Sequence, residues 1–185
     1  MTPWAAGPPA LALLLVGAGA AKLLRPRETA LALVRAVWSH EASAPGRVAK
    51  TTVRVGAAAE LLIGVADLAR GGRILSLLVS LSYLAFGVFV TWALIGRRPL
   101  ASCGCFGEPD TPPTAAHVAF CAVACLVAGL NSWHGPAWSL PMLIGRIGPL
   151  APALLLLVLG IGYCGYLILG PGARLTQIRS GAKIG

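Results

Sequence analysis

The run from Ile74 to Ile95 constrains the fold more than any other segment, because Tyr83 is its one ionisable side chain. An α-helix needs about 20 apolar residues to cross the hydrocarbon core of a bilayer, so the run predicts a membrane-spanning helix. The composition agrees: 57% of the residues are hydrophobic, 11% are charged, and the mean hydropathy is +0.79. We therefore expect an all-α fold, a polytopic membrane helix bundle in a lipid bilayer.

Four further apolar runs predict four further spans. Positive charge follows the first run and does not precede it, which indicates a retained span and not a cleaved signal peptide. The second run is short and reaches the length of a span only if it begins near Thr51. The runs are Pro8–Leu24, Val55–Ala69, Thr114–Trp133 and Gly148–Leu169.

The connections between these runs are polar or rich in glycine and proline. Arg25–Arg54 is too charged to cross, and within it Glu28–Trp38 predicts an amphipathic helix on the membrane surface. Arg70 to Arg73 predicts a tight turn through two glycines, and Asn131–Pro141, with its tryptophans, an interfacial loop.

The positive charges are distributed unequally between the two sides of such a bundle. All but three of the fifteen Lys and Arg residues fall on one side of a five-span arrangement, the exceptions being Arg70, Arg73 and Arg146. The positive-inside rule then predicts a cell-membrane protein with its N-terminus outside and the loop after Ile95 inside. The charges form no basic stripe interleaved with aromatic residues, so we expect no nucleic-acid partner.

Cys103 and Cys105 lie in that loop, within RRPLASCGCFGEPDTPP, and are separated by one glycine. Their sulfurs can meet if the backbone bends at Gly104, and a strained, accessible disulfide of this kind suits exchange better than structure. Exchange needs a thiolate, which the charges of Arg97 and Arg98 favour. The pair is therefore the candidate catalytic site.

Two other interpretations of the pair remain open. The cysteines can be ordinary loop thiols with no chemical role, or they can bind a soft ion such as Cu(I). Structural zinc would need two more ligands, and His117 is the one nearby candidate. The redox interpretation is preferred, so we expect no metal site and no cofactor.

Glu60 is the most unusual polar residue inside an apolar run, because a carboxyl there normally faces a partner or a cavity. Lys22 can pair with it or can extend to the membrane surface. Cys121 and Cys125 share one face of the fourth span, and Cys164 lies in the fifth. These three are either small packing residues or secondary thiols that pass electrons onward.

Three elements, taken in order, resemble one known family. GAGAAKLLRP in and after the first span, AELLIG in the second and SCGCFGE after the third are similar to the methylamine utilisation protein MauE, within the wider group of MauE and DoxX-like membrane proteins. The resemblance implies a four-helix membrane bundle that works with a thioredoxin-like partner in thiol-disulfide exchange, with Cys103 and Cys105 as the redox pair. Residues 1–133 would form this bundle, and residues 134–185 would add a fifth span and a basic tail.

We therefore expect a MauE-like membrane protein that carries out thiol-disulfide exchange or electron transfer during maturation of a partner protein. Whether it is itself an enzyme, a membrane thiol-disulfide oxidoreductase, is left open. The alternative is a non-catalytic assembly factor or a Cu(I)-handling protein. The predicted orientation conflicts with the chemistry, since disulfides form on the oxidising side of a membrane and the charges put the cysteine loop in the cytoplasm.

Overall fold

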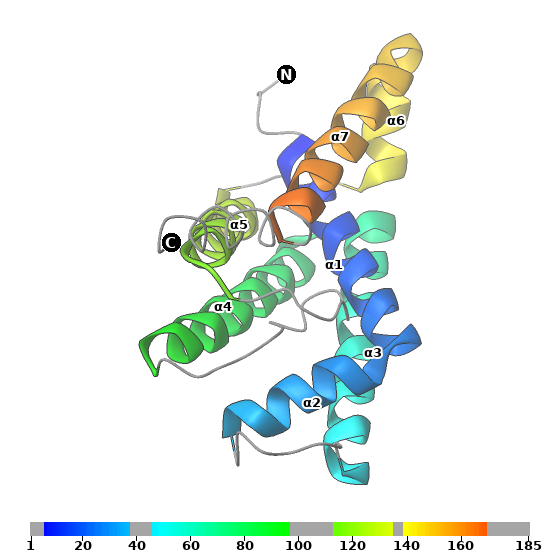
Figure 1. Ribbon diagram of the computed structural model, residues 1–185. Coiled ribbons are helices and arrows are strands. Elements are labelled where there is room, and N and C mark those ends of the chain that lie inside the picture. Colours follow the sequence, from blue (N-terminus) through cyan, green and yellow to red (C-terminus); the bar gives the residue numbers. More distant parts are fainter. Residues whose placement is uncertain (1–5, 38–45, 97–112, 135–138, 170–185) are drawn as a thin grey trace.

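The computed structural model describes residues 6–37, 46–96, 113–134 and 139–169 (Figure 1). Within these ranges the ordered elements are helices, with no β-strand, so the predicted all-α fold is confirmed. The helices are α1 Gly7–Leu24, α2 Pro26–Val37, α3 Arg47–Arg70, α4 Arg73–Ile95, α5 Ala115–His134, α6 Leu140–Ile147 and α7 Ala151–Leu169, and a 3-10 turn, η2 Gly148–Leu150, directly precedes α7.

Four segments of the described chain are long and apolar enough to cross a membrane, and they match four of the five predicted spans. The predicted second span, Val55–Ala69, lies inside α3, which is not among them. By length and composition alone α3 does not qualify as a span, because it carries Glu60 and Asp67 in its interior and further charges near its ends. The four segments are Gly7–Leu24, Arg73–Ile95, Ala115–Trp133 and Gly148–Leu169.

The helices α1 and α3 pack against each other with their backbones in close contact. A Cβ atom added at Gly19 would lie 2.7 Å from the carbonyl oxygen of Ala57. One added at Gly64 would lie 2.8 Å from the carbonyl oxygen of Ala12. Small residues at such crossing points allow membrane helices to approach closely, so any side chain at either glycine would push the pair apart.

The helices α4 and α5 form a second antiparallel pair, joined by polar side chains. Ser80 Oγ donates a hydrogen bond to the carbonyl oxygen of Cys125 at 2.8 Å. Nearer the start of α4, Asn131 Nδ2 donates to Ser76 Oγ at 2.9 Å. Hydrogen bonds of this kind hold membrane helices together where apolar contact with a neighbour offers no advantage over contact with lipid.

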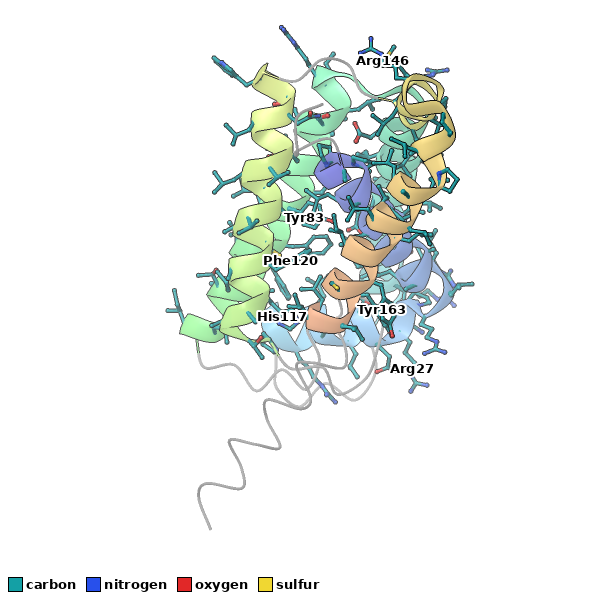
Figure 2. All side chains as sticks on the ribbon, turned by 90° about the horizontal axis from the view of Figure 1, so that it is seen from above. Arg27, Tyr83, His117, Phe120, Arg146 and Tyr163 are labelled. Carbon is teal, nitrogen blue, oxygen red and sulfur yellow. The ribbon has the colours of Figure 1, made fainter. Side chains whose placement is uncertain are left out.

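Tyr83 of α4 connects the two pairs at the centre of the bundle. Its hydroxyl donates to the carbonyl oxygen of Leu11 in α1 at 2.8 Å. Its ring meets the ring of Phe120 edge to face, with 6.2 Å between centroids (Figure 2). A buried phenol needs a hydrogen-bond partner, and the backbone of α1 provides it.

The last helix, α7, packs against α1 and α5. A Cβ atom at Gly165 would lie 2.6 Å from the side chain of Leu14 and 3.1 Å from the ring of Phe120, so α7 approaches both helices closely there. At the end of α7, the carbonyl oxygen of Leu169 accepts a hydrogen bond from His117 Nε2 at 3.0 Å. This bond satisfies one of the carbonyls that a helix leaves unpaired at its C-terminus.

The two short helices lie at opposite ends of the bundle (Figure 1). Ala30 of α2 is buried with Val53 near the start of α3. At the other end, Leu143 of α6 is buried in a cluster with residues of α1 and α7. Figure 2 shows the same arrangement, with Arg27 of α2 at one end of the bundle and Arg146 of α6 at the other.

Two predicted connections are present. The amphipathic helix predicted over Glu28–Trp38 corresponds to α2, which begins at Pro26 and ends at Val37. The turn between α3 and α4 is formed by Gly71 and Gly72, whose φ angles of 62° and 116° favour glycine.

Two other connections are shorter than predicted. Arg25–Arg54 does not remain outside helical structure to its end, because α3 begins at Arg47 and includes the charged residues from Arg47 to Arg54. The predicted interfacial loop Asn131–Pro141 was also too long, since α5 continues to His134 and α6 begins at Leu140. In both places polar and aromatic residues continue a helix beyond its apolar run, which hydropathy alone does not detect.

Candidate functional site

Lys22 and Glu60 form an ion pair between α1 and α3. Lys22 Nζ lies 2.7 Å from Glu60 Oε2 and 2.9 Å from Oε1. The side chains are 4% and 17% exposed, so Lys22 turns into the bundle and does not extend to the surface. The two candidate polar residues are therefore brought together, and each compensates a charge that would be costly to bury alone.

The ammonium group of Lys22 has a third neighbour. Its Nζ atom lies 3.9 Å from the centroid of the Phe86 ring in α4, within the range of a cation–π interaction. The ion pair and this contact together join three helices, α1, α3 and α4. Sequence reasoning missed Phe86, because an aromatic residue in an apolar span gives no sign of which residue its face meets.

A cavity of about 520 Å³ adjoins the ion pair, between α2, α3 and α4. We call it the α2/α3/α4 cavity. Glu60 and Lys22 line one part of its wall, and most of the remainder is apolar. Its other lining residues include Thr52, Gly56, Ser82, Phe86 and Phe89. The cavity was not predicted, because it depends on where α2 packs against α3.

A second hollow of about 550 Å³ lies between α1 and α7, and we call it the α1/α7 groove. Its lining includes Leu14, Gly17 and Tyr163, with Arg25 at the end of α1. It has no acidic lining residue among those described. The two hollows are similar in volume and differ in chemistry.

Asp67 is a buried residue that the sequence analysis did not single out. It is 7% exposed, and Ser76 Oγ donates to its Oδ1 atom at 3.3 Å. Because Ser76 also accepts a hydrogen bond from Asn131, this group links α3 to both α4 and α5. The signal available in the sequence was a second carboxyl seven residues after Glu60, on the same face of the helix.

The predicted catalytic cysteines, Cys103 and Cys105, lie outside the described residues. Their segment connects the end of α4 to the start of α5. Figure 2 shows His117, in the first turn of α5, at the same end of the bundle as Arg27 of α2. Phe89, in the last part of α4, lines the α2/α3/α4 cavity. α4 therefore ends, and α5 begins, at the end of the bundle toward which the cavity extends.

The three intramembrane cysteines have different environments. Cys121 is 4% exposed in the central core, Cys125 is partly buried with its Sγ atom 3.4 Å from Ser80 Oγ, and Cys164 is exposed on α7. None of these three forms a disulfide. Cys121 and Cys125 occupy packing positions between α4 and α5.

His117, the candidate zinc ligand, is fully buried with both ring nitrogens engaged. Its Nε2 atom donates to the carbonyl oxygen of Leu169, which leaves Nδ1 to accept from Thr114 Oγ1 at 2.8 Å. The histidine therefore joins α5 to α7 and presents no free nitrogen to a metal. Among the described residues, no group of three or more metal-ligating side chains is present.

An all-helical bundle with four apolar spans and an internal ion pair defines a multi-pass membrane protein. A family model described as methylamine utilisation protein MauE matches residues 4–134, which include α1 to α5. The chain belongs to the MauE family. α6, η2 and α7 lie beyond the matched residues, and no curated protein and no solved structure matches the chain.

Proposed function

We propose that this protein is a membrane component of thiol-disulfide exchange, with Cys103 and Cys105 as its redox pair and a thioredoxin-like protein as its partner. The observation that carries the proposal is the MauE-family match over residues 4–134, which include the CGC sequence between α4 and α5. The exchange supports maturation of a partner protein. Residues 1–133 carry this function, and residues 134–185 are an addition to it.

The exchange is reversible and conserves atoms and electrons. A thiolate of one cysteine attacks the partner's disulfide and forms a mixed disulfide, and one partner sulfur leaves as a thiolate. The second cysteine then attacks the mixed disulfide. The pair ends as a disulfide and the partner as a dithiol. Run in the opposite direction, the same steps oxidise the partner.

The proposal includes five membrane crossings, with α3 as the second. α3 contacts α1 from the Lys22–Glu60 pair to a small hollow that Pro9 and Asp67 line together. A helix that follows a spanning neighbour over this length lies at the same depth. Glu60 and Asp67 face bundle partners, which is where intramembrane carboxyls are tolerated.

Five crossings give the orientation that the charges favour, with the N-terminus outside and the cysteine segment inside. The partner is then a cytoplasmic dithiol or disulfide protein. Alkylation of intact cells with a membrane-impermeant maleimide measures on which side of the membrane the two cysteines lie. Protection of Cys103 and Cys105 in intact cells, and labelling after permeabilisation, is the expected result, and labelling of intact cells would reverse the orientation.

The test of the function is substitution of the pair. Cys103→Ser and Cys105→Ser are each expected to leave the partner's redox state fixed, and one of them should accumulate the mixed disulfide, because the resolving sulfur is missing. Non-reducing electrophoresis with mass spectrometry identifies the adduct. Cys164→Ser, an exposed cysteine beyond the family match, is the control and should behave as wild type.

Two outcomes would contradict the proposal. If the double variant still supports maturation of the partner, the pair has no redox role and an assembly function takes its place. If the purified protein binds Cu(I) stoichiometrically, and this binding is lost in the double variant while exchange is absent from the wild type, the pair handles metal.

A further inference from the structure

The walls of the α2/α3/α4 cavity favour a flat, apolar ligand. Phe86 and Phe89 contribute aromatic faces, and Gly56, Ala57 and Ala85 leave room between the helices. The volume of about 520 Å³ falls in the range of about 300–1,000 Å³ that small-molecule sites occupy. A planar ring between aromatic and small side chains fits these walls, since aromatic groups pair edge to face or offset.

The charge in the wall selects a neutral ligand. Lys22 and Glu60 are the charged groups among the lining residues, and each neutralises the other at 2.7 Å. An ionic ligand would find no net opposite charge here, and burying it would cost free energy. The head of the ligand must nevertheless form hydrogen bonds, because Glu60 is 17% exposed and its oxygens have lone pairs beyond those that Lys22 uses.

Hydroxyl groups add to the polar part of the wall. Ser82 Oγ donates its own hydrogen to the carbonyl oxygen of Leu78 within α4, so its oxygen can only accept a further bond. Thr52 on α3 lines the cavity too, and a threonine hydroxyl can donate a hydrogen bond as well as accept one. A ligand whose head changes between a carbonyl, which accepts, and a hydroxyl, which donates, can use both kinds of group.

We infer that this cavity binds the head group of a lipid-soluble quinone, which reoxidises the redox pair. The redox part of this inference rests on the proposed function. Two cysteine thiols form a disulfide and release two electrons and two protons, and the quinone takes up all four to become a quinol. Glu60 accepts a hydrogen bond from a quinol hydroxyl and is the one carboxyl among the described lining residues.

The position of the cavity agrees with this role. It extends from the middle of α4, at Ser82, to Phe89 near the end of that helix, after which the chain continues toward Cys103. A quinone reaches a site between membrane helices from the lipid, and the partner protein reaches the cysteine segment from water. The same end of the molecule thus meets both an apolar and an aqueous reactant.

The binding test uses the full-length protein in nanodiscs of phosphatidylcholine. Short-tailed benzoquinone and naphthoquinone analogues are titrated, and binding is measured by calorimetry. Gly56→Leu places a side chain in the cavity where nothing lies within 4 Å of the new Cβ atom, so the helix tolerates it. It is expected to weaken binding by ~10-fold or more, as overpacking a site does.

The matched control is Gly17→Leu. Gly17 lines the α1/α7 groove and also has nothing within 4 Å of an added Cβ atom, so this variant fills the other hollow and should bind quinone as wild type does. If no analogue binds the wild type, or if Gly56→Leu binds as well as Gly17→Leu, the quinone site does not exist. If the cavity binds phospholipid but none of the quinone analogues, the inference is also wrong.

A second measurement separates this inference from the proposed function. Cys103→Ser/Cys105→Ser should still bind quinone but should no longer reduce it when a dithiol partner is added. Quinone binding combined with normal client maturation in this variant would overturn the redox role and leave the binding site intact. If the wild type carries out disulfide exchange but binds no quinone, the quinone site is overturned and the proposed function stands.

Discussion

The two antiparallel helix pairs are held together by different means. α1 and α3 meet backbone to backbone at Gly19 and Gly64 and are joined by a buried ion pair. α4 and α5 are joined by hydrogen bonds of serine and asparagine side chains. The first pair depends on glycines at the crossing points and on charge compensation. The second depends on hydrogen bonds that each contribute little free energy. The first should therefore tolerate substitution less well.

Removing one member of the ion pair should have the largest effect. Glu60→Ala leaves the ammonium group of Lys22 buried without its counter-ion, and should cost about 3–5 kcal/mol of folding free energy. Thermal or denaturant unfolding in detergent measures this. The double variant Lys22→Met/Glu60→Met, which removes both charges, should recover most of the loss. Equal stability of Glu60→Ala and wild type would show that the ion pair does not stabilise α1 on α3.

Adding one methyl group at the helix crossing should have the next effect. Gly64→Ala places a Cβ atom 2.8 Å from a backbone oxygen of α1, and forcing the helices apart should cost ~1–3 kcal/mol. Gly56→Ala is the control on the same helix, since its Cβ atom meets nothing within 4 Å. The same unfolding measurement should separate the two variants, and equal stabilities would contradict the close approach.

The smallest effect is expected in the second pair. Ser80→Ala removes the hydrogen bond to the carbonyl oxygen of Cys125, and interhelical bonds of this kind contribute about 0.6 kcal/mol on average. Ser82→Ala is its control, because that hydroxyl bonds within α4 itself. If Ser80→Ala lowered the free energy of unfolding as much as Glu60→Ala, the two helix pairs would not differ in their tolerance of substitution.

The apolar spans could be predicted from the sequence, because a membrane span must satisfy its backbone internally and be apolar over its length. α4 follows the predicted range almost residue for residue. α3 could not be delimited in this way, since the charges from Arg47 to Arg54 hide its beginning. Hydropathy measures affinity for lipid, and α3 is stabilised in part by its neighbour α1.

For the candidate site, the sequence identified the residues but not their surroundings. Glu60 stood out by its chemistry, and its pairing with Lys22 was one of two alternatives that the structure decided. The cavity beside them, the contact with Phe86 and the burial of Asp67 depend on how three or more helices meet. Cys103 and Cys105 stay a prediction from sequence and family.

The Lys22–Glu60 pair has a consequence for how the protein enters the membrane. The chain is made from its N-terminus, so α1 is available before α3 emerges. α3 alone presents two carboxylates to the lipid, and the free energy of inserting it falls once Lys22 of α1 can neutralise Glu60. In the five-crossing arrangement that we propose, insertion of α3 is conditional on α1, and the two helices enter as a hairpin whose second arm depends on the first.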